Sequence, residues 1–152
     1  MKEVTTQLSK IIEDYQAMMN SINEEKFSFK PGPQKWSKKE ILGHIIDSAQ
    51  NNIRRFIVSQ YENTPTIVYN QDQWVEIGNY QKDLSKELIQ LWVLLNKRIC
   101  NILDNMPDDA LLRTCATDGN KSHTIVFLAQ DYLKHLLHHL HQVVELEPVG
   151  YP

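Results

Sequence analysis

Length, composition and charge describe an ordinary globular domain. The chain has 152 residues, of which 41% are hydrophobic and 23% are charged, and its formal net charge is −3. We therefore expect one domain over residues 1–152, long enough to bury a sizeable core. The slightly acidic balance gives no basic footprint, so we do not expect nucleic acid as the main partner. No apolar run approaches the ~20 residues of a membrane helix, and the first residues lack a signal-peptide core. We therefore do not expect a membrane as a partner either.

The two cysteines predict a reducing compartment. Cys100 and Cys115 are isolated in the sequence and form no CxxC pair. Two free thiols in a domain of this size are most simply reduced and buried, which indicates a cytoplasmic protein. Neither cysteine has a neighbouring base that would activate it, so we do not expect a catalytic thiol.

Apolar residues recur at three- and four-residue spacing in four long stretches, which predicts four helices. Ser37 and Glu40 form the S-x-x-E capping box that opens the second helix. Pro107 and Pro148 follow the third and fourth helices as stops. The chain has only five glycines and no long alternating stretch, which argues against a β-sheet. The expected helices cover about residues 4–24, 37–60 and 83–105, and a last helix starts between Ser122 and Thr124 and ends near Leu146.

The connection from Tyr61 to Lys82 is the longest one between expected helices. About twenty residues exceed what a compact domain usually needs, which indicates a crossover or a site-forming loop. Four helices of about twenty residues with one long crossover match a four-helix bundle better than an up-down-up-down array. We therefore predict an all-α four-helix bundle with its crossover between the second and third helices.

Four of the six histidines fall within residues 135–141. On a helical wheel, His139 borders the apolar sector centred on Tyr132, and His135 lies at the polar edge of that sector. Two imidazoles stacked one turn apart and facing a core form half of a divalent-metal site. His138 and His141 point away from the sector and are expected on the surface.

A further histidine, His44, lies on the second helix at the boundary of its buried stripe. With the pair on the fourth helix it would complete a three-histidine set. Three protein ligands and an open position are typical of catalytic metal sites, and imidazole suits zinc, nickel, iron or copper. Spacing does not place the second helix against the fourth, and a histidine on an apolar face is more often a hydrogen-bonded core residue. The same edge continues, as in a cleft wall, with Ser48, Asn52 and Arg55.

Further side chains are candidates to support such a site. Asp131, one turn before His135, and Asp47, three residues after His44, could each accept a ring N–H and so fix a tautomer. Arg55 is the candidate to hold an anionic group of a substrate or thiol cofactor. An ordinary surface position is the alternative for each of these charges. In the 61–82 connection, Trp74 could belong to a lid or could plug the end of the bundle.

Three segments resemble the DinB-like, or YfiT-like, superfamily. They are W-S-K-K-E-I-L-G-H at 36–44, Y-N-Q-D-Q-W-V at 69–75, and an H-x-x-H-H-x-x-Q pattern from His135 to Gln142. With the three segments in this order, the resemblance spans nearly the whole chain, from about Leu8 to Val144. The resemblance implies a four-helix bundle of up-down-down-up topology that forms a homodimer. It also implies a metal bound by His44, His135 and His139.

The resemblance further implies a metal-dependent enzyme that acts on a small molecule, with a divalent transition metal, zinc or nickel, as cofactor. An open metal position can lower the pKa of bound water and so support a hydrolase. It could instead bind a low-molecular-weight thiol, as in relatives that use bacillithiol or mycothiol for S-transfer. A different class of function stays open, namely a non-catalytic stress-response or ligand-binding bundle whose histidines are structural.

Overall fold

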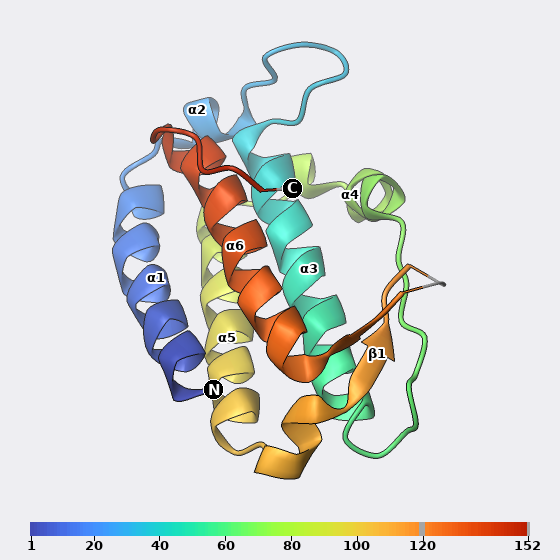
Figure 1. Ribbon diagram of the computed structural model, residues 1–152. Helices are drawn as coiled ribbons and strands as arrows, with labels where there is room; N and C mark the ends of the chain where they lie inside the picture. The colour runs from blue at the N-terminus through green and yellow to red at the C-terminus, as the bar shows by residue number, and fades with distance from the viewer. Residues whose placement is uncertain (119–120, 152) are drawn as a thin grey trace.

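Four long helices dominate the computed structural model, which describes residues 1–118 and 121–151. Figure 1 shows that the first helix runs up, the next two run down, and the last runs up again. This is the predicted all-α four-helix bundle of up-down-down-up topology. The long helices are α1 (Lys2–Asn20), α3 (Lys38–Val58), α5 (Ser85–Asp104) and α6 (Ile125–Val144).

The core lies between these four helices. α3 packs against α5 and α6, and α1 packs against the same two helices from the opposite side. Side chains such as Leu8, Ile45 and Leu136 are fully buried there, and burial of each stabilises the fold by about 1.5–3 kcal/mol. Because α3 and α6 are neighbours, their polar edges meet.

The start of α3 is set by the predicted capping box. The Ser37 hydroxyl accepts from the Glu40 backbone N–H at 3.2 Å, and the Glu40 carboxylate accepts from the Ser37 N–H at 2.7 Å. Two N–H groups that the helix leaves unpaired are thereby satisfied. The box therefore fixes where α3 begins, at Lys38, six residues before His44.

The connections contain more structure than the sequence predicted. The first helix ends at Asn20 instead of residue 24, and a short helix, α2 (Glu24–Ser28), follows it. The connection between residues 61 and 82, expected to be a crossover or a site-forming loop, contains α4 (Gln71–Gly78) and the 3₁₀ turn η1 (Tyr80–Lys82). The Asn70 side chain caps α4, and Asn79 ends it in the left-handed conformation that asparagine tolerates.

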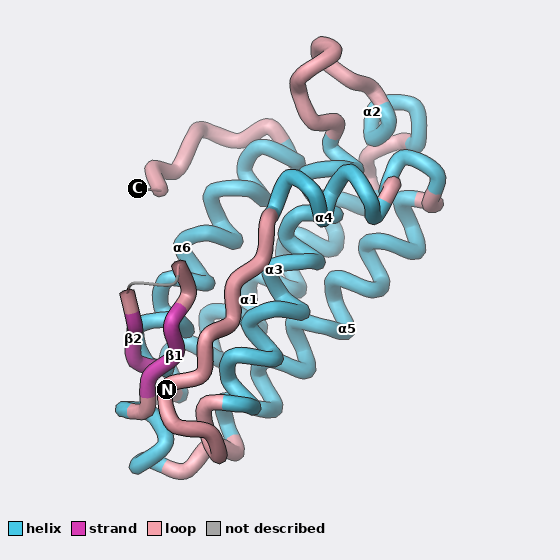
Figure 2. The backbone as a smooth tube through the Cα atoms, turned by 90° about the vertical axis from the view of Figure 1, so that its right-hand side faces the viewer, coloured by secondary structure: helices cyan, strands magenta, loops and turns pink. Residues whose placement is uncertain are grey.

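A β-hairpin corrects the expectation that the chain has no sheet. Strands β1 (Thr114–Ala116) and β2 (Ser122–Thr124) pair antiparallel, with Cys115 opposite His123. They follow the 3₁₀ turn η2 (Asp108–Leu112) and lead into α6, as Figure 2 shows. Strands of three residues are too short to produce a visible alternation of apolar and polar side chains.

Among the described residues, no helix is both long enough and apolar enough to cross a membrane. Cys115 is buried, Cys100 is partly buried, and both are free thiols.

Candidate metal centre

The structure brings together the three histidines that the sequence singled out. His44 is buried on α3, and His135 and His139 are half-buried on α6. One ring nitrogen of each lies within 4.8 Å of the others. His44 Nε2 and His135 Nε2 are 3.0 Å apart. Two imidazole nitrogens at about 2.0–2.1 Å from one tetrahedral ion would be about 3.3 Å apart. The spacing of the donors therefore fits a single transition-metal ion.

The three imidazole rings meet edge to face. Their centroids are 4.9, 4.6 and 4.6 Å apart, and each pair is nearly perpendicular. Trp36, from the segment before α3, covers His44 at 5.2 Å between centroids. The Trp36 ring therefore shields the centre from solvent on one side.

Burial keeps these histidines neutral. It lowers the pKa of His44 to about 4 and that of His135 to about 3, with His139 adding to both shifts. It also lowers the pKa of His139, although the Gln142 side chain acts in the opposite direction. The neutral imidazole is the form that binds metals, so the donor set is ready at neutral pH without losing protons first.

Hydrogen bonds at the far side of two rings leave their Nε2 atoms available. His135 Nδ1 is 3.4 Å from the Ser48 hydroxyl, and His139 Nδ1 is 2.9 Å from Gln142 Oε1. Because an amide oxygen only accepts, His139 must donate from Nδ1, which places its lone pair on Nε2. Donation from His135 to Ser48 would have the same effect.

Gln142 is itself oriented by the neighbouring histidine. Its Nε2 is 3.1 Å from His138 Nε2, and His138 Nδ1 is 2.6 Å from the Val149 carbonyl oxygen. Only one set of donors satisfies this series of hydrogen bonds: His139 donates to Gln142, Gln142 donates to His138, and His138 donates to the Val149 carbonyl oxygen. The expectation that His138 and His141 are solvated was wrong, because both are half-buried and His141 Nδ1 contacts the Glu147 carbonyl at 2.6 Å.

We predict that Gln142→Leu weakens metal binding about 10- to 100-fold, the usual effect of removing the partner of a metal-bound histidine. The His139 ring would remain, but its tautomer and orientation would no longer be fixed. Competition titration with a zinc chelator measures the change. Gln130→Leu is the matched control, since Gln130 is exposed on the same helix. Equal affinities of the two variants would show that Gln142 does not orient His139.

The two predicted supporting carboxylates have other partners. Asp47 is buried and accepts a hydrogen bond from the Tyr80 hydroxyl, while its Oδ2 and His44 Nδ1 are both without a partner among the described residues. Burial raises the pKa of Asp47 to about 6, against the effect of the Tyr80 hydrogen bond. Asp131 accepts from the Tyr151 hydroxyl at 2.8 Å instead of from His135. Ser48 occupies the role expected of Asp131.

A small cavity borders the centre on the His135 side. Its volume is about 210 Å³. Trp74, expected either in a lid or as a plug at the end of the bundle, is outside it and packs edge-on against the Tyr69 ring at 5.5 Å. Tyr151, which no motif or helical stripe indicated, has its ring 5.3 Å from that of His135. The lining includes Ser48, Asn52, Arg55, Asp131, His135 and Tyr151.

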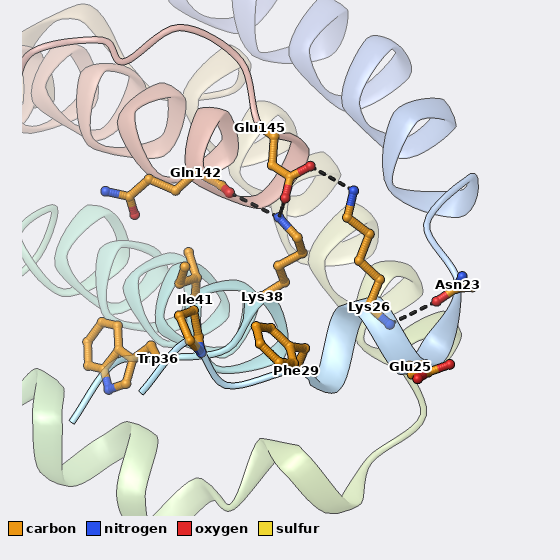
Figure 3. Close-up of a pocket in the computed structure, with 10 residues that line it drawn as sticks. Asn23, Glu25, Lys26, Phe29, Trp36, Lys38, Ile41, Gln142 and Glu145 are labelled. Atoms are coloured by element: carbon orange, nitrogen blue, oxygen red, sulfur yellow. Dashed lines mark hydrogen bonds and ion pairs between the residues drawn. The ribbon is translucent and has the colours of Figure 1, made fainter. Parts of the chain in front are cut away.

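The lining of a larger hollow, of about 620 Å³, includes Trp36, which packs on His44, and Gln142, which is bonded to His139. In Figure 3, Lys38 reaches Glu145 across this hollow, with Trp36 and Gln142 on its walls. Lys38 Nζ and Lys26 Nζ lie 3.1 and 2.7 Å from the Glu145 carboxylate. None of the three clustered histidines lines this hollow, so the smaller cavity is the one next to the candidate chemistry.

The model of the DinB superfamily matches residues 7–143. This chain belongs to the DinB superfamily. Several Bacillus proteins are 29% identical to it over 80 residues, among them a "Putative metal-dependent hydrolase" of Bacillus mycoides (strain KBAB4) and one of Bacillus cereus (strain B4264). The match covers 52% of this chain and 46% of each relative. The chain thus spans about half the length of the curated relatives it matches.

Solved structures share the fold of this DinB-superfamily chain. YfiT from Bacillus subtilis, described as "a probable metal-dependent hydrolase with an unusual four-helix bundle topology", matches with a TM-score of 0.77 and 22% identity over 95% of this chain and 86% of its own. A mycothiol-dependent maleylpyruvate isomerase matches with a TM-score of 0.74 and 11% identity, over 99% of this chain and 64% of its own. These similarities establish the bundle topology.

Proposed function

We propose that the protein is a metal-dependent enzyme that acts on a small molecule, with a divalent transition metal, zinc or nickel, held by His44, His135 and His139. One observation carries the proposal: three neutral imidazoles converge, and no further His, Cys, Asp or Glu of the described residues joins their group. Three protein ligands with a free position are typical of catalytic sites, whereas structural sites have four.

Hydrolysis is the reaction that this arrangement supports best. When bound, the metal would lower the pKa of a water molecule and polarise a substrate oxygen. Ser48 and Gln142 would orient the imidazoles, and Trp36 would limit access of bulk water. Asp131 lines the same cavity as His135 and would accept a proton from a nucleophile there.

Thiol transfer is the second candidate. The fold is shared with a mycothiol-dependent isomerase, and a free metal position can bind a thiolate as well as a water. A low-molecular-weight thiol would then be the co-substrate. The metal held by the same three histidines would lower the pKa of that thiol when bound to it. The two candidates differ in whether turnover needs an added thiol.

The test compares metal-loaded and metal-stripped protein, purified without a histidine tag, on a panel of small esters, amides and electrophiles, each with and without added thiol. We expect turnover only in the metal-loaded protein, and activity without thiol would identify a hydrolase. A protein that binds one metal ion per chain but gives no turnover with any substrate class would favour the non-catalytic bundle. A protein that binds no metal would contradict the proposal.

A further inference from the structure

Arg55 is a partly buried cation that has no anionic partner among the described residues. Its Nε and Nη2 both donate to the Ile67 carbonyl oxygen, at 3.3 and 3.0 Å, and its guanidinium carbon lies 5.9 Å from the centre of the Tyr69 ring. The ion pairs among the described residues all involve lysines, so no described carboxylate lies within 4.0 Å of this guanidinium. Burial lowers the pKa of Arg55, which reflects the cost of keeping a charge there.

The Arg55 side chain lines the cavity next to the candidate metal centre. Arg55 and His135 both line it, together with the neutral polar side chains of Ser48, Asn52 and Tyr69. The volume of about 210 Å³ is smaller than the roughly 300–1,000 Å³ of pockets for drug-sized ligands. A ligand that fills the cavity is therefore small, and its charged end would lie beside Arg55.

We propose that this cavity binds a small carboxylate, whose charged group pairs with the Arg55 guanidinium while the rest of the molecule extends toward His135. A planar carboxylate matches the fork of a guanidinium better than other small anions of single charge. The inference deepens the proposed function by naming the substrate class, and its meaning for catalysis rests on that function. Binding of the carboxylate itself needs no metal.

Among the described residues that line the cavity, Asp131 is the one carboxylate. It is engaged by the Tyr151 hydroxyl and acts on the Arg55 charge from beyond ion-pair distance. A bound carboxylate would be repelled by Asp131 and attracted by Arg55. Substitution of Arg55 should therefore weaken, and substitution of Asp131 should strengthen, the binding of the same carboxylate.

The experiment titrates propionate, with propionamide as a neutral analogue of the same shape, into isotope-labelled protein followed by NMR. Arg55→Met should weaken propionate binding at least about tenfold. Asp131→Asn should tighten it several-fold, and Arg55→Lys should retain part of it. Arg54→Met is the matched control, because Arg54 is exposed on the same helix and should leave the affinity unchanged. Propionamide should not bind measurably.

Each titration is repeated in His139→Ala, which removes a proposed metal ligand that does not line the cavity. Binding that depends on Arg55 in both backgrounds supports the inference, even if the protein proves to hold no metal. Propionate that binds wild type and Arg55→Met equally, but not His139→Ala, would locate the anion on the metal and overturn the inference. Equal binding of propionate and propionamide would overturn it too, and would leave Arg55 as a tether for the segment around Ile67.

Discussion

Replacement of His139 by alanine is expected to reduce metal affinity at least a hundredfold, and His44→Ala and His135→Ala should have the same effect. Structural zinc sites with four ligands bind with about 10–16 kcal/mol, which is roughly 3 kcal/mol for each ligand. Loss of about 3 kcal/mol is a factor of more than 100 in the dissociation constant. Metal analysis after dialysis against a weak chelator should find about one ion per wild-type chain and none in the variants.

His141→Ala and His123→Ala are the controls for this loss. His141 lies on the same helix and contacts the Glu147 carbonyl, and His123 stacks on Phe127 at 4.4 Å between ring centroids. Both variants should bind metal as wild type does, and the thermal unfolding of every variant should be measured without metal. Metal that remains bound after any of the three ligand substitutions would show that the histidines are core residues and not ligands.

Gly43→Ala is expected to destabilise the fold by about 2–4 kcal/mol, although alanine in a helix interior usually stabilises by about 1 kcal/mol. The reason is steric, because a Cβ at residue 43 would overlap the ring of Tyr80. That ring cannot move aside easily, since its hydroxyl is bonded to the buried carboxylate of Asp47 on the same helix. Overpacking of this kind costs about 1–3 kcal/mol or more. The midpoint of thermal unfolding should fall by roughly 5–12 °C.

A second background separates the clash from other effects. In Tyr80→Ala the ring is gone, so adding Gly43→Ala there should be neutral or stabilising. Gly32→Ala is the control in wild type, because a Cβ there would meet only the Lys35 side chain at 4.0 Å. A loss of stability from Gly43→Ala that persists in the Tyr80→Ala background would refute the steric explanation.

Helical periodicity in the sequence was enough to predict the three histidines of the candidate site. His44, His135 and His139 each fall at the border of an apolar stripe, and a side chain there faces a neighbouring helix without entering the core. The wheel could place each histidine on its own helix but could not bring α3 beside α6. That step came from the resemblance to the DinB-like superfamily, and the structure agrees with it.

The hydrogen-bond and packing partners of those histidines could not be predicted from helical periodicity, because they depend on contacts between separate segments. Tyr151 reaches His135 because the segment after α6 folds back, held by carbonyl oxygens that accept from His138 and His141. The pairing of Tyr80 with Asp47 depends on how the crossover packs on Gly43. Neither pattern is local in the sequence. Metal identity, the homodimer, the cytoplasmic location and the single domain over 1–152 stay predictions.

The most direct measurement is anomalous X-ray diffraction from crystals of metal-loaded protein, collected on both sides of the absorption edge of the bound metal. We predict one anomalous peak per chain, at about 2.0–2.2 Å from a ring nitrogen of His44, His135 and His139. We also expect a fourth, non-protein ligand on the side of the cavity that His135 and Arg55 line. A peak on other residues, or a fourth protein ligand that closes the site, would show that this is not an open three-histidine metal site.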